Sequence, residues 1–305
     1  MHFGDRLFQE IKNKSPICVG IDPRIRLIPQ FIKKNSLEEF GDTPEAVATA
    51  FFDFSVSIID SVYDLVPVIK PQLAFFEMYG HAGIKAFEDI CQYAQEKGLL
   101  VIADGKRNDI GSTAEAYAEG LLGKPLMIET NQATNFVDAL TVNPYLGSDG
   151  IKPFQEVCDK NDKGIFILVK TSNPSSGEVQ DLTSGDEFVH EKIAHLVAGW
   201  GTQNIGETNY SNVGAVVGAT YPEEAAYLRS LMTNQFFLVP GYGAQGAGAR
   251  EVKPCFNADG TGAIVNSSRG ILFAYKKSKK YSEENFEDVA REAVLDMKED
   301  LESIF

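Results

Sequence analysis

The residues best suited to chemistry in this chain stand at the end of an apolar run. Val101-Ile102-Ala103 leads directly into Asp104-Gly105-Lys106-Arg107-Asn108-Asp109, so that two acids bracket a lysine. In an extended segment, residues two apart share a face, so Asp104 and Lys106 can point into the same space, whereas Asp109 lies beyond the strand. Charged side chains at the mouth of a buried strand are typical of a catalytic site.

Polar residues also follow several other apolar runs. These are Asp22, Lys70, Gln72, Lys170, Thr171 and Ser172. Any one of them has an ordinary structural explanation, because an aspartate after a strand commonly caps a helix or forms a turn. Their repetition at the ends of apolar runs instead predicts that they gather on one rim of a sheet or barrel.

The last two apolar runs carry features of a phosphate site. Residues 240–248 contain four glycines, with Gly243 and Gln245 among them, and Arg269 follows the final run at the start of an expected helical turn. A glycine-rich loop leaves backbone N–H groups free to approach a ligand, although alone it is a weak signal. Barrels commonly bind phosphate between the loops after strands seven and eight. We therefore predict that Gly243, Gln245 and Arg269 bind a phosphate group.

Short apolar runs alternate with segments of helical periodicity along the chain. The predicted strands are residues 17–21, 66–69, 99–103, 139–142, 165–169, 213–217, 236–239 and 263–265. The predicted helices include residues 44–62, 83–96, 113–122, 150–159, 187–203 and 222–232. Continuous apolar runs indicate parallel strands covered by helices. Eight such units favour an α/β fold of the (β/α)8 TIM barrel type, with a doubly wound open sheet as the alternative.

No stretch rich in proline, glycine or serine divides the sequence, so we expect residues 1–305 to form one domain. Residues 24–41 and 173–186 are polar and directly follow predicted strands. We expect both to be long loops on the catalytic face of the barrel.

Composition limits the classes of partner. The chain has 305 residues, is 44% hydrophobic and carries a net charge of −15. That charge would repel nucleic acid and anionic membrane surfaces, although a local cationic site can still bind an anionic substrate. The four cysteines are far apart and are expected to be reduced and buried. Without an apolar leader or membrane-length apolar run, the sequence predicts a cytoplasmic protein.

These motifs resemble those of the orotidine 5′-monophosphate decarboxylase family. Asp104-Gly105-Lys106-Arg107-Asn108-Asp109-Ile110-Gly111-Ser112-Thr113 is similar to the family signature Asp-x-Lys-x-x-Asp-Ile-x-x-Thr, and Pro240-Gly241-Tyr242-Gly243-Ala244-Gln245-Gly246 is similar to its phosphate-gripping loop. The resemblance continues through Gly20-Ile21-Asp22-Pro23, Lys70, Thr171-Ser172 and Arg269, and so covers nearly the whole chain. The local motif and the length resemble the longer branch of the family.

The resemblance implies a homodimeric barrel that converts orotidine 5′-monophosphate to uridine 5′-monophosphate and CO₂, the last step of de novo synthesis of uridine 5′-monophosphate. It implies no metal and no organic cofactor. Lys106 would stabilise and protonate a carbanion at C6 of the pyrimidine, while Asp104 and Asp109 hold the lysine charged and Lys70 balances the acids.

The resemblance also assigns the substrate contacts. Asp22 and Lys70 would bind the ribose hydroxyls, Thr171 and Ser172 the pyrimidine, and Gln245, Arg269 and the Gly243 loop the phosphate. Asp109, Ile110 and Thr113 would come from the partner subunit, giving shared active sites. Gln72 stands where the family pattern has an asparagine.

Two other functions are compatible with part of the pattern. Metal-dependent barrels of the same superfamily decarboxylate or build sugar phosphates, but they carry a glutamate where this chain has Lys70, and the nearest acid downstream is Glu77. A non-catalytic nucleotide-binding barrel is the second alternative. The presence of Lys70, Asp104, Lys106 and Asp109 together favours the decarboxylase.

Overall fold

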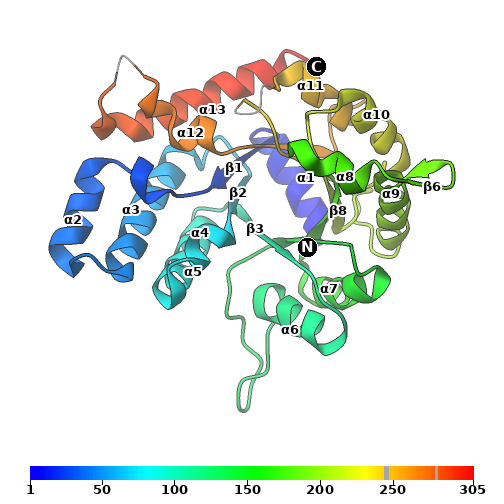
Figure 1. Cartoon of the computed structure of the whole chain (residues 1–305), viewed down its shortest axis with the longest axis horizontal. Coiled ribbons are helices and arrows are strands. Elements are labelled where there is room, and N and C mark those ends of the chain that lie inside the picture. Colours follow the sequence, from blue (N-terminus) through cyan, green and yellow to red (C-terminus); the bar gives the residue numbers. More distant parts are fainter. Residues whose placement is uncertain (244–246, 279–280) are drawn as a thin grey trace.

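Eight parallel strands close into a barrel in the computed structural model of the chain, which describes residues 1–243, 247–278 and 281–305 (Figure 1). The barrel strands are β1 (Ile17–Ile21), β2 (Val68–Pro71), β3 (Leu100–Arg107), β4 (Ala139–Val142), β5 (Gly164–Lys170), β8 (Val213–Val217), β9 (Phe237–Val239) and β10 (Ala263–Ser267). Their order around the barrel follows the chain, and β10 closes onto β1 through the pairs Ile17–Val265 and Val19–Ser267. The predicted (β/α)8 barrel is confirmed, and the open sheet is excluded.

The barrel strands are buried on both faces, as their continuous apolar runs predicted. One cluster of side chains, including Val68, Ile102, Phe166 and Leu238, fills the barrel interior. A larger cluster packs the outer faces of the strands against the surrounding helices, with Val19, Ile69 and Val101 among the strand residues. The barrel is therefore a packed core, and its chemistry is confined to its carboxyl end.

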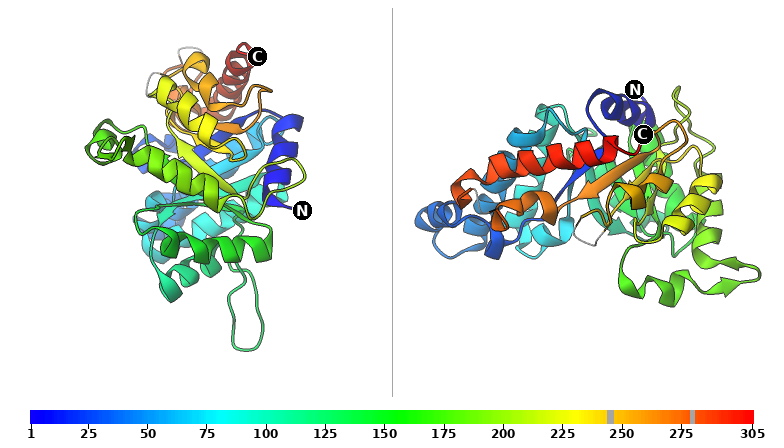
Figure 2. Two further views of the ribbon diagram at one scale, coloured as in Figure 1. Left: turned by 90° about the vertical axis from the view of Figure 1, so that its right-hand side faces the viewer. Right: turned by 90° about the horizontal axis from the view of Figure 1, so that it is seen from above.

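Helices surround this barrel, as the two views of Figure 2 show. They are α1 (Phe3–Asn13), α2 (Gln30–Phe40), α3 (Pro44–Val62), α4 (Leu73–Glu77), α5 (Gly80–Glu96), α6 (Gly111–Leu122), α7 (Ser148–Asn161), α8 (Gly177–Gln180), α9 (Val189–Trp200), α10 (Pro222–Leu231), α11 (Ala249–Val252), α12 (Arg269–Leu272) and α13 (Phe286–Glu302). The six predicted helices are present, with ends that shift by a few residues. Helix α9 begins later than predicted because Glu187 and Phe188 form the short strand β7, which pairs with β6 (Thr183–Ser184).

The two segments predicted to be long loops are largely structured, so that prediction was wrong. Residues 24–41 contain a 3₁₀ turn (Ile25–Leu27) and helix α2, and residues 173–186 contain a second 3₁₀ turn (Pro174–Ser176), α8 and β6. Helix α2 buries only Ile32 and Ser36, so its apolar face is too narrow to give a clear periodic signal in the sequence. Helix α8 has a single turn and buries none of its residues.

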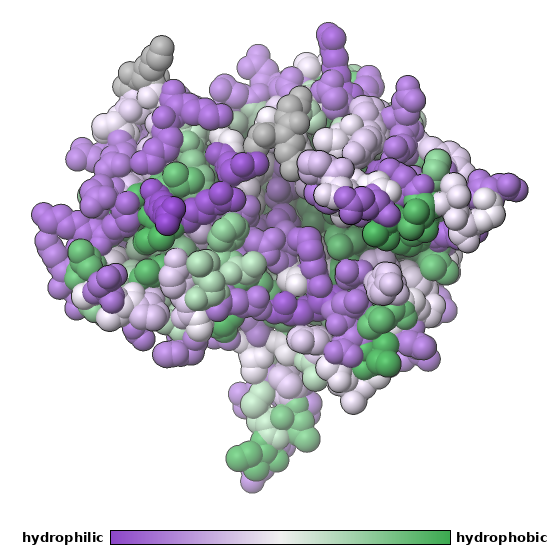
Figure 3. Space-filling view, viewed as in Figure 1, coloured by the Kyte–Doolittle hydropathy of each residue, from purple (hydrophilic) through white to green (hydrophobic). Residues whose placement is uncertain are grey.

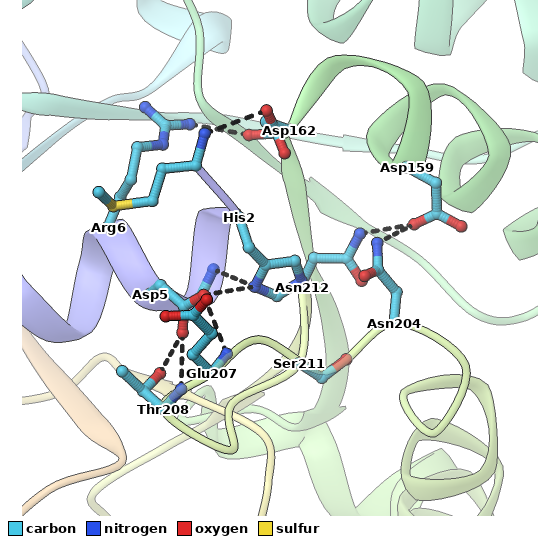
Figure 4. Close-up of polar contacts among 12 residues, drawn as sticks. His2, Asp5, Arg6, Asp159, Asp162, Asn204, Glu207, Thr208, Ser211 and Asn212 are labelled. Carbon is cyan, nitrogen blue, oxygen red and sulfur yellow. Dashed lines mark hydrogen bonds and ion pairs between the residues drawn. The ribbon is translucent and has the colours of Figure 1, made fainter.

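Helix α1 closes the amino-terminal end of the barrel. Its Phe3 and Leu7 are buried in the interior cluster, and Asp5 accepts hydrogen bonds at Oδ1 from the backbone N–H (2.8 Å) and hydroxyl (2.6 Å) of Thr208 (Figure 4). Asp159 ties the same end together by accepting at Oδ1 from the amides of Asn204 (2.6 Å) and Asn212 (2.8 Å). Because these contacts lie at the end opposite the polar rim, we interpret them as structural.

The segment between α6 and β4 projects away from the barrel at the bottom of Figure 1. Leu126 and Asn131 pair across it, and Ile128 at its tip is 99% exposed. Figure 3 shows apolar side chains gathered on this projection. Among the described residues, no helix has both the length and the apolar composition that a bilayer crossing requires.

Candidate active site

Asp104 is the centre of the charged group at the carboxyl end of the barrel. Its Oδ2 accepts from Lys70 Nζ (2.6 Å) and Gln72 Nε2 (3.0 Å). Its Oδ1 accepts from Lys106 Nζ (2.6 Å) and Thr141 Oγ1 (2.9 Å). Four donors from β2, the residue after β2, β3 and β4 thus converge on one carboxylate. The predicted common orientation of Asp104 and Lys106 is confirmed.

Burial and neighbouring charges act in opposite directions on the pKa values of Asp104 and Lys70. Asp104 is 7% exposed and Lys70 is 6% exposed. Burial alone would raise the pKa of Asp104, but the ammonium groups of Lys70 and Lys106 hold it well below its ordinary value. Burial alone would lower the pKa of Lys70, but the carboxylates of Asp104 and Asp22 raise it above its ordinary value. Asp104 and Lys70 are therefore both ionised at neutral pH.

Lys106 adopts a backbone conformation that side chains rarely take. Its φ is +44°, in the left-handed region, and its N–H donates to Thr141 Oγ1 (3.0 Å). The pairing of β3 with β4 is irregular between Ala103 and Arg107, which brackets this residue. The irregularity turns the Lys106 ammonium back toward Asp104 while leaving its side chain partly exposed to the cavity.

A cavity of about 390 Å³ opens in front of the lysines. Its lining comprises Lys70, Asp104, Lys106, Thr141, Leu168, Thr171, Ser172, Asn173, Gln180, Val216, Leu238 and Pro240. The surface in Figure 3 is hollowed near its centre, where hydrophilic side chains gather. The cavity therefore combines an apolar floor with a cationic side and a wall of hydroxyl and amide groups, which suits a small polar molecule with negative charge.

The predicted base-binding residues lie on this wall. Gln180 holds Thr171 by accepting from the Thr171 N–H (2.9 Å) and donating to Thr171 Oγ1 (2.8 Å). Thr171 Oγ1 in turn donates to Asn173 Oδ1 (2.6 Å). Ser172 packs so closely against Gly218 that a Cβ on this glycine would lie 3.0 Å from the Ser172 backbone nitrogen. The wall is thus fixed by contacts on two sides.

Asp22 lies near Lys70 but is not one of the residues that hydrogen-bond with Asp104. It follows β1, it contributes to the raised pKa of Lys70, and its Oδ1 is buried without a hydrogen-bond partner among the described residues. A buried acceptor of this kind at a cavity edge is suited to binding a hydroxyl group.

Asp109, Ile110 and Thr113 are not brought into the cavity of their own chain. Asp109 Oδ1 accepts from the backbone N–H of Ile110 (2.8 Å), and neither residue lines the cavity. Thr113 lies in the first turn of α6, with its side chain exposed. The geometry agrees with the expectation that Asp109 points elsewhere.

The phosphate-binding prediction is only partly within the described residues. Gln245 lies outside them. Pro240 lines the cavity, Gly243 has a φ of +72°, and Arg269 is the exposed first residue of α12, as the sequence predicted. Asp300 of α13 accepts from Tyr242 Oη (2.7 Å) and from the Ala249 N–H (3.0 Å), which ties both ends of the glycine-rich segment to one carboxylate.

Three of these residues escaped the sequence analysis. Thr141 lies inside β4, whereas the residues predicted from the sequence stand at or beyond the ends of strands. Gln180 and Asp300 are distant in sequence from the residues they hold, and no local pattern marks them. Glu77, in contrast, pairs with Arg107 and does not line the cavity, as expected.

A closed parallel barrel with a lysine–aspartate array beside a cavity at its carboxyl end defines a barrel enzyme. The model of the Orotidine 5′-phosphate decarboxylase / HUMPS family matches residues 15–283. The chain belongs to this family.

Known relatives extend along the full chain. A protein of Rhodopirellula baltica is 45% identical over 294 residues, which span 95% of each chain, and one of Caldicellulosiruptor bescii is 42% identical over 99% of this chain and 98% of its own. Both are named orotidine 5′-phosphate decarboxylase, a carboxy-lyase. Among solved structures, the Leishmania donovani OMP decarboxylase is similar with a TM-score of 0.76 and 30% identity, covering 100% of this chain and 98% of that one.

Proposed function

We propose that the chain decarboxylates orotidine 5′-monophosphate to uridine 5′-monophosphate and CO₂, the last step of de novo uridine 5′-monophosphate synthesis. The observation that carries this proposal is the contact of Lys70 and Lys106 with one buried carboxylate, Asp104, at the edge of an open cavity. The names of the full-length relatives support the same reaction.

The reaction needs a cation beside C6 of the pyrimidine. When the bond between C6 and the carboxylate breaks, its electron pair stays on C6 in the plane of the ring, where the ring π-system cannot delocalise it. The Lys106 ammonium stabilises this carbanion and then transfers a proton to C6, and water returns a proton to the lysine. Because Asp104 contacts Lys106 Nζ at 2.6 Å, the ammonium is positioned before the substrate arrives.

Asp104 has a second role in this mechanism. Once the substrate is bound, its carboxylate faces the carboxylate that leaves as CO₂, and two such charges about 4 Å apart repel by roughly 4 kcal/mol at an effective dielectric constant near 20. The repulsion is relieved as neutral CO₂ forms. Lys70 keeps Asp104 ionised during this step.

The remaining substrate groups are assigned to the rest of the rim. Asp22 and Lys70 bind the ribose hydroxyls, and Thr171 and Ser172 bind the pyrimidine. Gly243, Gln245 and Arg269 bind the phosphate, whose binding energy drives closure around the reacting ring. Alanine at Arg269 is expected to weaken binding of the phosphorylated substrate far more than that of its nucleoside, and equal losses would refute the phosphate assignment.

A decarboxylation assay tests the reaction. Loss of orotidine 5′-monophosphate is followed by its ultraviolet absorbance in the native chain, in Lys106→Ala and in the presence of a chelator. We expect activity in the native chain with or without chelator and none in the variant. Activity that disappears with chelator would favour a metal-dependent sugar-phosphate enzyme, and activity that survives in Lys106→Ala would refute the mechanism.

A homodimer with shared sites completes the proposal. Asp109, Ile110 and Thr113 serve the cavity of the partner subunit, and the exposed apolar side chains of Ile110, Tyr145 and Leu146 support an interface here. Tyr145 and Leu146 lie just before helix α7, and the start of this helix packs against Asp109, because a Cβ added at Gly150 would lie 3.1 Å from the Asp109 carbonyl oxygen. The exposed apolar side chains are therefore close to Asp109.

Mixing two inactive variants tests the shared site. Random exchange between equal amounts of Lys106→Ala and Asp109→Ala gives about half hybrid dimers with one intact site each, so about a quarter of all sites recover. No recovery under exchanging conditions would refute the sharing. We also place the chain in the cytoplasm, where thiols such as those of its four free, buried cysteines stay reduced.

A further inference from the structure

A second buried lysine lies behind the wall of the cavity. Lys170, the last residue of β5, is 1% exposed. Its ammonium is paired with Asp181, lies 3.0 Å from Glu224 Oε2 in α10 and lies 4.7 Å from the ring centroid of Tyr221. His190 of α9 completes the group, with Nδ1 3.3 Å from Asp181 Oδ1 and Nε2 3.9 Å from Glu224 Oε2. We call Lys170, Asp181, His190 and Glu224 the Lys170 cluster.

The ammonium of Lys170 already occupies the place between the two acids. Asp181, His190 and Glu224 could by their types and spacing hold a cation. Since Lys170 contacts both carboxylates, the cation of this cluster is the lysine itself. Burial alone would lower the pKa of Lys170, but the hydrogen bonds and charges of Asp181 and Glu224 hold it above its ordinary value.

The Lys170 cluster is joined to the cavity through Gln180. Asp181 directly follows Gln180, and His190 Nδ1 lies 2.8 Å from the Gln180 carbonyl oxygen, to which it can donate. The Gln180 side chain holds both the N–H and the hydroxyl of Thr171, which lines the cavity. A displacement of Asp181 or His190 would therefore move Gln180 and, through it, Thr171 in the cavity wall.

We propose that Lys170 is a positioning residue that fixes Gln180, and through it Thr171, as the base-recognising wall of the cavity. This inference rests on the proposed function, because the base is the pyrimidine of that substrate. Lys170 does not line the cavity and therefore acts only through the segment that it anchors. Gln180 sets the direction of the Thr171 hydroxyl, since its amide satisfies Thr171 at two points.

Kinetics of three variants test the proposal. We expect Lys170→Met and Gln180→Ala each to raise KM for orotidine 5′-monophosphate about tenfold with a much smaller change in kcat, because each disorders a wall that binds the substrate without touching the reacting carbon. Val179→Ala is the matched control, because Val179 precedes Gln180 in α8 and is 55% exposed. Gln180→Ala leaves the side chains of the Lys170 cluster in place, so an unchanged KM in this variant would overturn the proposal.

Hydrogen exchange tests the anchoring independently of the reaction. Backbone amides of residues 171–190 are expected to exchange faster in Lys170→Met than in the native chain, while those of β4 remain unchanged. If the native chain does not decarboxylate orotidine 5′-monophosphate, the proposed function fails while the exchange result still decides the anchoring. If the native chain is active and exchange is unchanged in the variant, the inference fails alone.

Discussion

Replacing Asp104 with asparagine tests whether the charged array is held together by this one carboxylate. Asparagine keeps the size of the side chain but removes its charge, and it presents an NH₂ group to one of the two lysines. Lys70, at 6% exposure, would then be a buried ammonium without the partner that lies 2.6 Å away in the native chain. The variant therefore measures the cost of leaving a buried charge unpaired.

The expected cost is large compared with that of an ordinary surface substitution. At 2.6 Å and an effective dielectric constant near 20, each lysine attracts the carboxylate by about 6 kcal/mol, most of which offsets the cost of removing the charges from water. Removing one partner of a buried pair typically lowers the free energy of unfolding by about 3–5 kcal/mol. We expect this loss for Asp104→Asn at pH 7.

The direction in which the stability deficit of Asp104→Asn changes with pH identifies the unpaired Lys70 as its cause. In the native chain, the lowered pKa of Asp104 contributes stability above the ordinary aspartate range, and the raised pKa of Lys70 contributes stability below the ordinary lysine range, so both contributions are present at pH 7. In Asp104→Asn, burial without the carboxylate lowers the pKa of Lys70. The lysine then loses its proton more easily in the folded chain, and the stability deficit shrinks between pH 7 and pH 10.

Urea unfolding at fixed protein concentration, followed by the fluorescence of Trp200, the single tryptophan, measures both effects. Asp42→Asn is the control, because Asp42 is an exposed residue between α2 and α3 and its substitution should change stability by no more than about 0.5 kcal/mol. A deficit below about 1 kcal/mol at pH 7, or one that grows toward pH 10, would refute the reasoning.

Three further predictions concern the walls of the cavity and the surrounding helices. Gly218→Ala should raise KM at least severalfold, because the new Cβ would lie 3.0 Å from the Ser172 backbone nitrogen, and an unchanged KM would show that the wall yields freely. Tyr242→Phe, which removes the hydrogen bond to Asp300, should raise KM for the phosphorylated substrate more than for its nucleoside; equal changes in the two KM values would contradict a role in phosphate binding. Gly199→Ala in α9 should raise the free energy of unfolding by about 0.5–1 kcal/mol, because a Cβ there meets open space. Urea unfolding measures this change, and a lower free energy of unfolding in the variant would contradict the prediction.

The barrel could be predicted from the sequence because its strands are buried on both sides. Residues 17–21, 139–142 and 213–217 were predicted with their observed bounds. Helix α2 was missed because most of its residues face water. Helix α1 was also not predicted, although its Phe3 and Leu7 stand at helical spacing and are buried. Local periodicity reports burial, so elements with little buried surface leave little signal.

The sequence predicted the active-site residues that stand at the ends of strands, but it did not predict the contacts between residues of different elements. The sequence predicts that Asp104 and Lys106 share a space because they stand two apart along one strand, but it does not predict the left-handed backbone of Lys106 that accompanies their contact. The bond from Thr141 to Asp104 depends on the register between β3 and β4, which is irregular at this point. Lys170 is the last residue of β5, yet its ammonium lies behind the wall with Asp181 and Glu224, because those acids come from segments that only the folded chain brings together.

The left-handed backbone of Lys106 sets a limit on how this barrel can be made more robust. A side chain held at a φ of +44° costs roughly 1–3 kcal/mol, and glycine at position 106 would release that strain while removing the ammonium. The same change would remove one of the two ammonium groups that pair with the buried Asp104, so a selection for resistance to heat alone would balance strain against charge at this position without regard to activity. Under the proposed function, the strained backbone at position 106 holds the ammonium that turnover requires, so engineering for stability should leave this residue unchanged.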